Sequence, residues 1–160
     1  MKIGNSMKYL LILMTSIIFN QAYAGLPVTP VADQAALLLS HDPKLATNKR
    51  LVYDFTRIIL AGRRLEQAAV FLNEGYIQHN PNVETGLKGF LDFFSKLGGS
   101  RPIPDTIKGL VAMTTEGDLV TMAFVDTRKD ADGETYTTTW FDMFRIGNGK
   151  IAEHWDNDTK

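Results

Sequence analysis

The chain has 160 residues, 44% of them hydrophobic, and a formal net charge of −1. Cysteine is absent, which excludes disulfides, thiolate catalysis and cysteine metal sites. The mild acidity, without a basic patch, argues against a nucleic-acid partner.

Residues 1–24 have the three parts of a cleaved secretory signal peptide. Lys2 and Lys8 form a basic start, residues 9–19 form a mostly apolar run, and Ala22-Tyr23-Ala24 supplies small residues at the cleavage positions. The apolar run is too short to span a bilayer comfortably, although an uncleaved anchor is the alternative. We expect a periplasmic or secreted protein with no stable membrane insertion after cleavage. Removing 24 residues from 160 leaves 136, enough for one domain with a core.

The first part of the mature chain predicts helices. Residues 25–46 read as an extended leader with a short helix over 32–39, which ends before Pro43. A stronger helix is expected over 47–62, where apolar residues recur at spacings of three and four. A second, shorter helix is expected over 65–72.

The next segment predicts an extended piece and a third helix. Residues 75–81 read as a short extended segment that stops at proline, and Thr85 is placed to cap a helix over 86–97.

After residue 99 the hydrophobic pattern changes to the period of strands. Four strands rich in β-branched and aromatic residues are expected over 107–115, 119–128, 136–146 and 150–156. Helices followed by an antiparallel meander predict an α+β domain over residues 47–160. We expect its long curved sheet to wrap around the N-terminal helices as a cone with an apolar interior.

The last two strands carry ionisable groups among large apolar residues. Alternation places Trp140, Asp142 and Phe144 on one face of the first strand, and His154 and Asp156 on one face of the second. One hairpin register sets Asp142 opposite His154, and another sets it opposite Asp156. Either register gathers two carboxylates and an imidazole on a partly apolar wall, which predicts a site of chemistry.

Three sequence features together resemble a known family. They are Tyr76-Ile-Gln-His-Asn-Pro81, Gly86 and Phe90 on the following helix, and Asp142-x-x-Arg145-Ile-x-x-Gly-Lys-Ile-x-Glu-His-Trp-Asp156. This pattern resembles the SnoaL-like polyketide cyclases of the nuclear-transport-factor-2-like superfamily, and bacterial proteins described as predicted SnoaL-like aldol-condensation enzymes. The likeness covers about residues 47–157. It implies a cone-shaped α+β fold, no cofactor and a homodimer.

The resemblance also implies site residues. Asp156 matches the aspartate that acts as general acid and base in the cyclases, and His154 matches a histidine beside it. Asp142 stands where the cyclases have a histidine, and Trp140 where they have a polar residue. These two departures put cyclisation of an aromatic polyketide in doubt, as does export.

We therefore expect Asp156, Asp142 and His154 to be catalytic. The expected substrate-binding residues are Trp140, Tyr76, His79, Asn80 and Phe144. Structural alternatives stay open: Asp156 exposed at the chain end, Asp142 paired with Arg57 or Arg63, His154 structural, the hydroxyl of Tyr76 satisfied in the core, and His79 and Asn80 stabilising a turn. No metal site is expected, because the histidines lie on distant segments.

Three functions compete. The leading hypothesis is a cofactor-independent enzyme that moves a proton next to a carbonyl of a small apolar molecule. An epoxide hydrolase using Asp126 and Arg128 is a weaker alternative. A non-catalytic small-molecule-binding or interaction domain is the third. Apolar residues on the opposite sheet face, Phe141, Met143 and Trp155, predict a homodimer interface.

Overall fold

The computed structural model describes residues 25–160, so the predicted signal peptide lies outside the described part. The strands are β1 (Leu72–Gln78), β2 (Leu110–Glu116), β3 (Leu119–Lys129), β4 (Thr135–Gly147) and β5 (Lys150–Asp156). They form one sheet in the order β1-β5-β4-β3-β2. The helical segments are α1 (Gln34–Leu37), α2 (Pro43–Phe55), the π-helix η1 (Thr56–Ala61), the short 3-10 helix η2 (Leu65–Gln67), α3 (Ala68–Phe71), α4 (Gly86–Phe94) and the 3-10 helix η3 (Ser95–Leu97).

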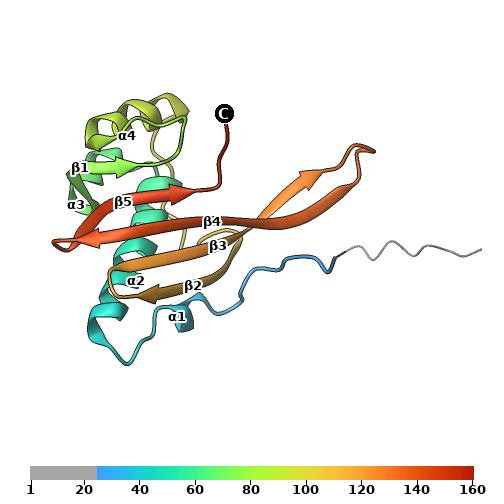
Figure 1. The fold of residues 1–160 in the computed structure, drawn as a ribbon, viewed down its shortest axis with the longest axis horizontal. Coiled ribbons are helices and arrows are strands. Elements are labelled where there is room, and N and C mark those ends of the chain that lie inside the picture. Colours follow the sequence, from blue (N-terminus) through green and yellow to red (C-terminus); the bar gives the residue numbers. More distant parts are fainter. Residues whose placement is uncertain (1–24) are drawn as a thin grey trace, which may run out of the picture.

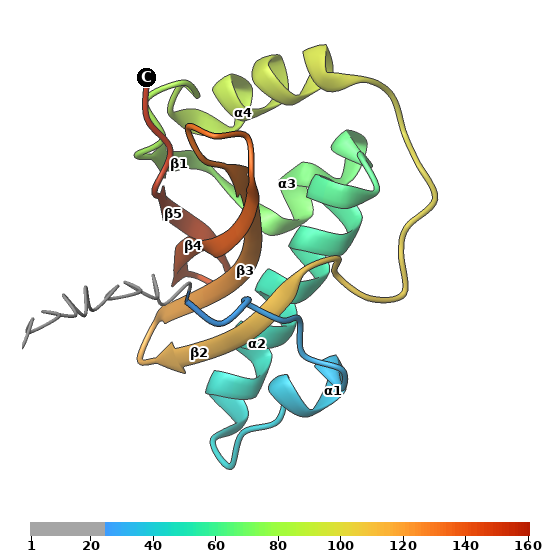
Figure 2. The same cartoon turned by 90° about the vertical axis from the view of Figure 1, so that its right-hand side faces the viewer.

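The sheet is strongly curved, and α2 lies along its concave side while α4 covers the end near β1 (Figures 1 and 2). This arrangement confirms the predicted α+β class, with a curved sheet wrapped around N-terminal helices. Among the described residues, no helix combines the length and apolar character needed to cross a membrane.

The main helix begins earlier than the sequence pattern indicated. It starts at Pro43, because the Asp42 carboxylate caps it by accepting a hydrogen bond from Lys44 N at 2.7 Å. The preceding segment contacts the domain through Gln34, a buried side chain. Its amide donates to Ile107 O at 2.7 Å and accepts from Ile107 N at 2.8 Å.

The helix predicted over residues 65–72 is one residue shorter in the structure. The extended segment predicted over 75–81 begins three residues earlier, as strand β1. The helical conformation stops at Phe71, and β1 starts at Leu72. This strand pairs in parallel with β5, setting Leu72 beside Ile151 and Gln78 beside His154. The parallel pairing was not expected from the meander pattern, since it joins segments far apart in sequence. It brings the segment after Tyr76 next to the C-terminal hairpin.

The β4–β5 hairpin adopts the register that sets Asp142 opposite Asp156. Asn148 and Gly149 have φ of 54° and 74°, as a tight two-residue turn requires. Between Glu153 and Ile151, β5 holds one extra residue, which shifts the pairing by one. The second expected register is therefore correct, but a bulge produces it rather than a longer loop.

Apolar side chains from both layers fill the interior of the cone. Phe55 on α2 is central: its ring lies 6.1 Å from Phe71, 5.9 Å from Phe90 and 5.9 Å from Phe144. These rings hold α2, α4 and β4 together, so the wall carrying the ionisable groups is fixed by the core.

Candidate active site

A cavity of about 270 Å³ lies between the helices and the inner face of the C-terminal hairpin. Its apolar lining is Phe55, Leu60, Val83, Phe90, Phe93, Phe94 and Phe144, and its polar lining is Arg63, Tyr76, Gln78, Asn80, Asp142, His154, Asp156 and Asp158. An apolar pocket of this size with a few convergent polar groups suits one small molecule. A larger hollow of about 490 Å³ beside the start of α2 and the β4–β5 turn has neither carboxylate nor imidazole in its lining.

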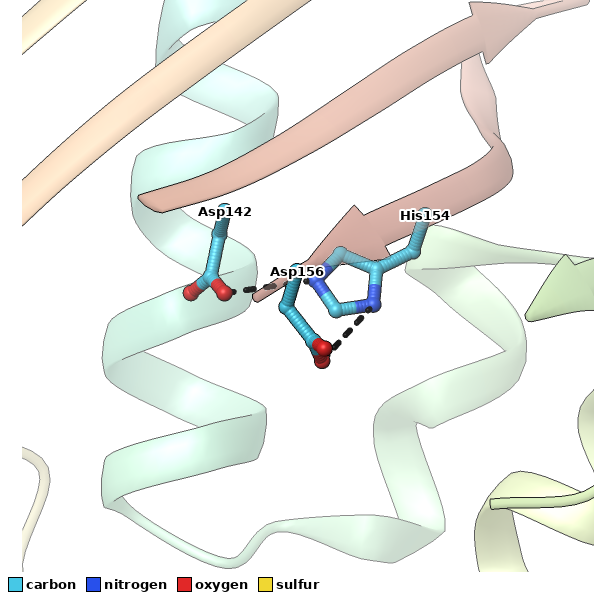
Figure 3. Close-up of side chains that lie close together, drawn as sticks. All are labelled: Asp142, His154 and Asp156. Atoms are coloured by element: carbon cyan, nitrogen blue, oxygen red, sulfur yellow. Dashed lines mark ion pairs between the residues drawn. The ribbon is translucent and has the colours of Figure 1, made fainter. Parts of the chain in front are cut away.

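Asp142, His154 and Asp156 converge on this cavity (Figure 3). His154 Nε2 lies 3.4 Å from Asp142 Oδ1, and His154 Nδ1 lies 3.9 Å from Asp156 Oδ2. The side chains of Asp142 and Asp156 are only 16% and 5% exposed. The structure thus brings together the three residues expected to be catalytic.

Gln78 determines which nitrogen of His154 carries a proton. The Gln78 Oε1 atom accepts a hydrogen bond from Asn80 N at 2.9 Å, which identifies it as the carbonyl oxygen. His154 Nδ1 lies 2.9 Å from the same oxygen and must therefore donate to it. The remaining nitrogen, Nε2, faces Asp142. This contact is attractive only when a second proton lies between Nε2 and the carboxylate oxygen. The imidazole and Asp142 together can hold and release a proton towards the cavity.

Hydrogen bonds orient both carboxylates. Trp140 Nε1 donates to Asp142 Oδ1 at 2.8 Å. Asn80 Nδ2 donates to Asp156 Oδ2 at 2.7 Å, and the main-chain nitrogen of Asp158 donates to Asp156 Oδ1 at 3.0 Å. These hydrogen bonds fix the orientation of both carboxylates beside the cavity.

Tyr76 supplies a hydroxyl beside the acidic pair. Burial, followed by the neighbouring Asp142 and Asp156 carboxylates, raises the pKa of Tyr76 well above its ordinary value. The phenol therefore stays protonated. Its oxygen accepts from Gln78 Nε2 at 3.0 Å, and its own hydrogen has no acceptor among residues 25–160. Tyr76 can accordingly donate to an oxygen of a bound molecule.

Two of the expected binding residues lie elsewhere. His79 does not line the cavity: its ring stacks on Trp155 at 5.0 Å, on the outer face of the sheet, and its Nε2 donates to Glu153 Oε1 at 2.8 Å. Trp140 is also absent from the lining and acts on the site through its hydrogen bond to Asp142. Asn80, Tyr76 and Phe144 do line the cavity.

The alternation of side chains along a strand could have shown, from the sequence alone, that His79 lies outside the site. Tyr76, Gln78 and Asn80 alternate along one segment and all face the cavity, so His79 falls on the other side. Gln78, which was not among the expected site residues, lies inside for the same reason. The alternative pairing of Asp142 with Arg57 or Arg63 is not formed: Arg57 pairs with Asp54, and neither arginine pairs with Asp142.

The Asp142–His154–Asp156 cluster is the one group in the described chain that could hold a metal ion. One ligand atom from each residue lies within 4.8 Å of the others. This geometry is compatible with a cation, although no metal site was expected from sequence. The carboxylate oxygens that would bind it also accept hydrogen bonds from Trp140 and Asn80.

Asp126 and Arg128, the residues of the epoxide hydrolase alternative, form a separate ion pair. Arg128 Nε donates to Asp126 Oδ2 at 2.6 Å, and neither residue lines the cavity. The pair lies towards the end of β3 that projects beyond the body of the domain in Figure 1.

Comparisons with known proteins agree with this architecture. The model of the SnoaL-like domain family matches residues 52–154. A candidate polyketide cyclase from Acidithiobacillus ferrooxidans is 17% identical, with a TM-score of 0.53, covering 74% of this chain and 90% of that one. A candidate SnoaL-like polyketide cyclase from Jannaschia sp. CCS1 is 14% identical, with a TM-score of 0.52, covering 74% and 91%.

A third structure with this fold is a nuclear-transport-factor-2-like protein of unknown function from Burkholderia pseudomallei. It is 12% identical, with a TM-score of 0.50, and the match covers 69% of this chain and 89% of that one. No curated protein matches the sequence. At these identities the structures show the fold alone, whereas the family model covers most of the domain. The chain belongs to the SnoaL-like domain family and has the nuclear-transport-factor-2-like cone fold.

Proposed function

We propose that this protein is an exported, cofactor-independent acid/base enzyme that moves a proton next to a carbonyl of a small, mostly apolar molecule. The observation that supports the proposal is the meeting of Asp142, His154 and Asp156 at one largely apolar cavity. Two carboxylates on directly opposite strand positions repel each other, so the sheet retains them at a cost. Such a constellation in a cavity is typical of proton transfer.

We infer a role for each group from its position at the cavity. Asp156 takes a proton from the carbon beside the carbonyl, and the electrons of the broken C–H bond form the enolate. Tyr76 donates a hydrogen bond to the oxygen on which negative charge develops. Either Asp156 then returns the proton to a different carbon of the conjugated enolate, as in isomerisation, or the enolate carbon attacks a second carbonyl carbon. In the second case the new alkoxide takes a proton from the His154–Asp142 pair, and the proton held by Asp156 returns to that pair to complete the cycle.

A binding function without catalysis is the second candidate. It is favoured by the hydrogen bonds that both oxygens of Asp156 accept, because a carboxylate satisfied by the protein can serve structure alone. Both functions place the ligand in the same cavity. They differ in whether the ligand loses a proton.

Deuterium exchange at the carbon beside a carbonyl tests the proposal directly. The mature protein is incubated in D₂O with a panel of small aryl ketones and 1,3-dicarbonyl compounds, and incorporation is followed by NMR. We expect the wild type to accelerate exchange for at least one member. Asp156→Asn should lower that rate by roughly two orders of magnitude or more, the usual worth of a positioned base.

Asp132→Asn, in the exposed β3–β4 loop, is the matched control and should exchange at the wild-type rate. Binding of a panel member without acceleration, or equal rates for wild type and Asp156→Asn, would favour the binding function instead. Rates restored by added divalent cation and abolished by chelator would show that the three-residue cluster acts through a metal.

A further inference from the structure

We propose that Arg63, beside Phe94, forms an anion-binding subsite of the same cavity, and that the natural ligand carries a carboxylate. The inference deepens the proposed function, because it adds a charge and a direction to the substrate. It rests on the cavity and on the surroundings of Arg63.

The guanidinium of Arg63 is a partly buried cation, and its two buried nitrogens have no anionic partner. Its Nε and Nη1 atoms are inaccessible to solvent and have no hydrogen-bond acceptor among residues 25–160. The residue lines the cavity. Buried donors almost always find an acceptor, and a buried charge left unpaired is costly. A ligand oxygen would relieve that cost.

The neighbours of Arg63 are an aromatic ring and another positive charge, and neither can serve as its anionic partner. Its guanidinium carbon lies 5.0 Å from the centre of the Phe94 ring, and Leu60 and Phe93 also line the cavity. Burial and then the positive charge of Arg101 lower the pKa of Arg63 from its ordinary value. Both causes disfavour the cation in the free protein, and a bound anion would oppose both.

The backbone holds Arg63 in an unusual conformation. Its φ is +55°, a left-handed value that long side chains seldom adopt. The strained turn is secured by Arg101 N, which donates to Gly62 O at 2.8 Å, and by Ser100 Oγ, which donates to Arg63 O at 3.3 Å. Strain of this kind is often retained where it positions a functional group.

The charged residues that line the cavity favour one orientation of such a ligand. Asp142, Asp156 and Asp158 also line the cavity and repel an anion, while Arg63 attracts it. A ligand with a carboxylate at one end and a neutral carbonyl at the other would therefore place the carbonyl near Asp156. Guanidinium pairs with carboxylate through two parallel hydrogen bonds, which fixes direction as well as affinity.

The test compares carboxylates with their neutral methyl esters. Benzoate, phenylacetate and 3-benzoylpropionate, each with its ester, are titrated into the mature protein by calorimetry and ligand-observed NMR. For at least one pair we expect the acid to bind at least about tenfold tighter, as a charge-assisted hydrogen bond in a desolvated site would give. If no pair shows this preference, the proposal is overturned.

Variants assign the preference to a residue. Arg63→Met keeps an unbranched side chain, removes the guanidinium that lies over Phe94, and should bring the acid down to the affinity of its ester without changing the ester. Arg101→Met removes the neighbouring charge, which is exposed and does not line the cavity, and should keep the preference. A preference that survives in Arg63→Met would contradict the subsite and leave Arg63 a structural cation stacked on Phe94.

Two further measurements keep the outcomes separate. The Arg63 Nε–H signal of the wild type should shift when the preferred acid is added and not with its ester, whether or not Arg63→Met folds. Asp156→Asn should lose proton exchange while keeping the preference for the acid. Loss of exchange alone therefore concerns the proposed function, and loss of the acid preference alone concerns the subsite.

Discussion

Carboxylate and imidazole groups lie at both faces of the β4–β5 hairpin. On the outer face they are paired and in contact with solvent, whereas on the inner face they are nearly buried. On the outer face, Arg145 Nε donates to Glu153 Oε2 at 2.9 Å and Arg145 Nη1 to Asp118 Oδ2 at 3.1 Å. His79 bonds the other oxygen of Glu153 and stacks on Trp155. Each of these charged groups has a partner of opposite charge and contact with solvent.

The inner face has two carboxylates and one imidazole, and they are nearly buried. The two carboxylates face a single imidazole, and no arginine or lysine pairs with them among residues 25–160. The comparison teaches that the position of an acid within the sheet, rather than its presence in the motif, separates structural ion pairing from potential chemistry.

The largest expected effect is on stability. Phe144→Ala removes an inner-face ring that is 1% exposed, packs on Phe55 and stacks on His154 at 4.6 Å. It should lower the free energy of unfolding by about 3–5 kcal/mol. Tyr136→Ala, on the same strand but 46% exposed, should change it by less than about 0.5 kcal/mol. Urea unfolding measures both, and equal losses would show that the inner face is not the core.

The second effect concerns association. Phe141 is 50% exposed on the outer face, and we propose that a second copy of the chain covers it in a homodimer. Phe141→Asp should then weaken dimerisation by about 2 kcal/mol or more, as for a central interface residue. Tyr136→Asp is the control. Sedimentation velocity measures both, and a wild type that is monomeric at micromolar concentration would exclude this interface.

The third effect tests the supporting hydrogen bonds of the inner face. Gln78→Leu removes the oxygen that holds His154 Nδ1–H, so the imidazole can rotate or change tautomer. We expect deuterium exchange to slow by about tenfold, corresponding to one lost hydrogen bond of about 1.4 kcal/mol. The fully exposed Gln67→Leu should leave the rate unchanged. An unaltered rate in Gln78→Leu would remove this glutamine from the site.

The smallest effect concerns the outer face and pH. The hydrogen bond from His79, followed by that from Arg145, lowers the pKa of Glu153. A lowered folded-state pKa stabilises the protein above the unfolded-state value, and this gain is lost as pH falls through the folded-state value. Glu153→Gln should therefore cost less than about 1 kcal/mol at neutral pH and nothing in strong acid. Unfolding curves across acidic pH check this, and a cost that grows as pH falls would contradict it.

Much of this arrangement could be predicted from the sequence, because it follows from the local spacing of apolar and polar residues. The helix-then-strand order gave the fold class, and alternation in β4 and β5 placed Asp142, His154 and Asp156 on one face. The same alternation, applied to residues 76–80, would have placed His79 outside and Gln78 inside.

Other features depend on contacts that no local pattern contains. The bulge in β5 selects the register, and the parallel pairing of β1 with β5 joins segments far apart in the chain. Thr85 lies at the predicted N-cap of α4, but its hydroxyl contacts Gln78 N at 3.2 Å instead of capping the helix. Arg63 lines the cavity, and its backbone adopts a left-handed conformation. The adjacent Arg63 and Arg64 gave no sign in the sequence of which one would do so.

The most direct test of the difference between the two faces is where the protons lie on the histidines. The chain has three histidines, so His154 on the inner face and His79 on the outer face can be resolved together by long-range ¹H–¹⁵N NMR. We predict a protonated Nδ1 on His154, and an Nε2 signal that shifts in Asp142→Asn while the His79 signals stay unchanged. A proton on Nε2 alone, or an Nε2 signal indifferent to Asp142→Asn, would contradict a shared proton at the inner cluster.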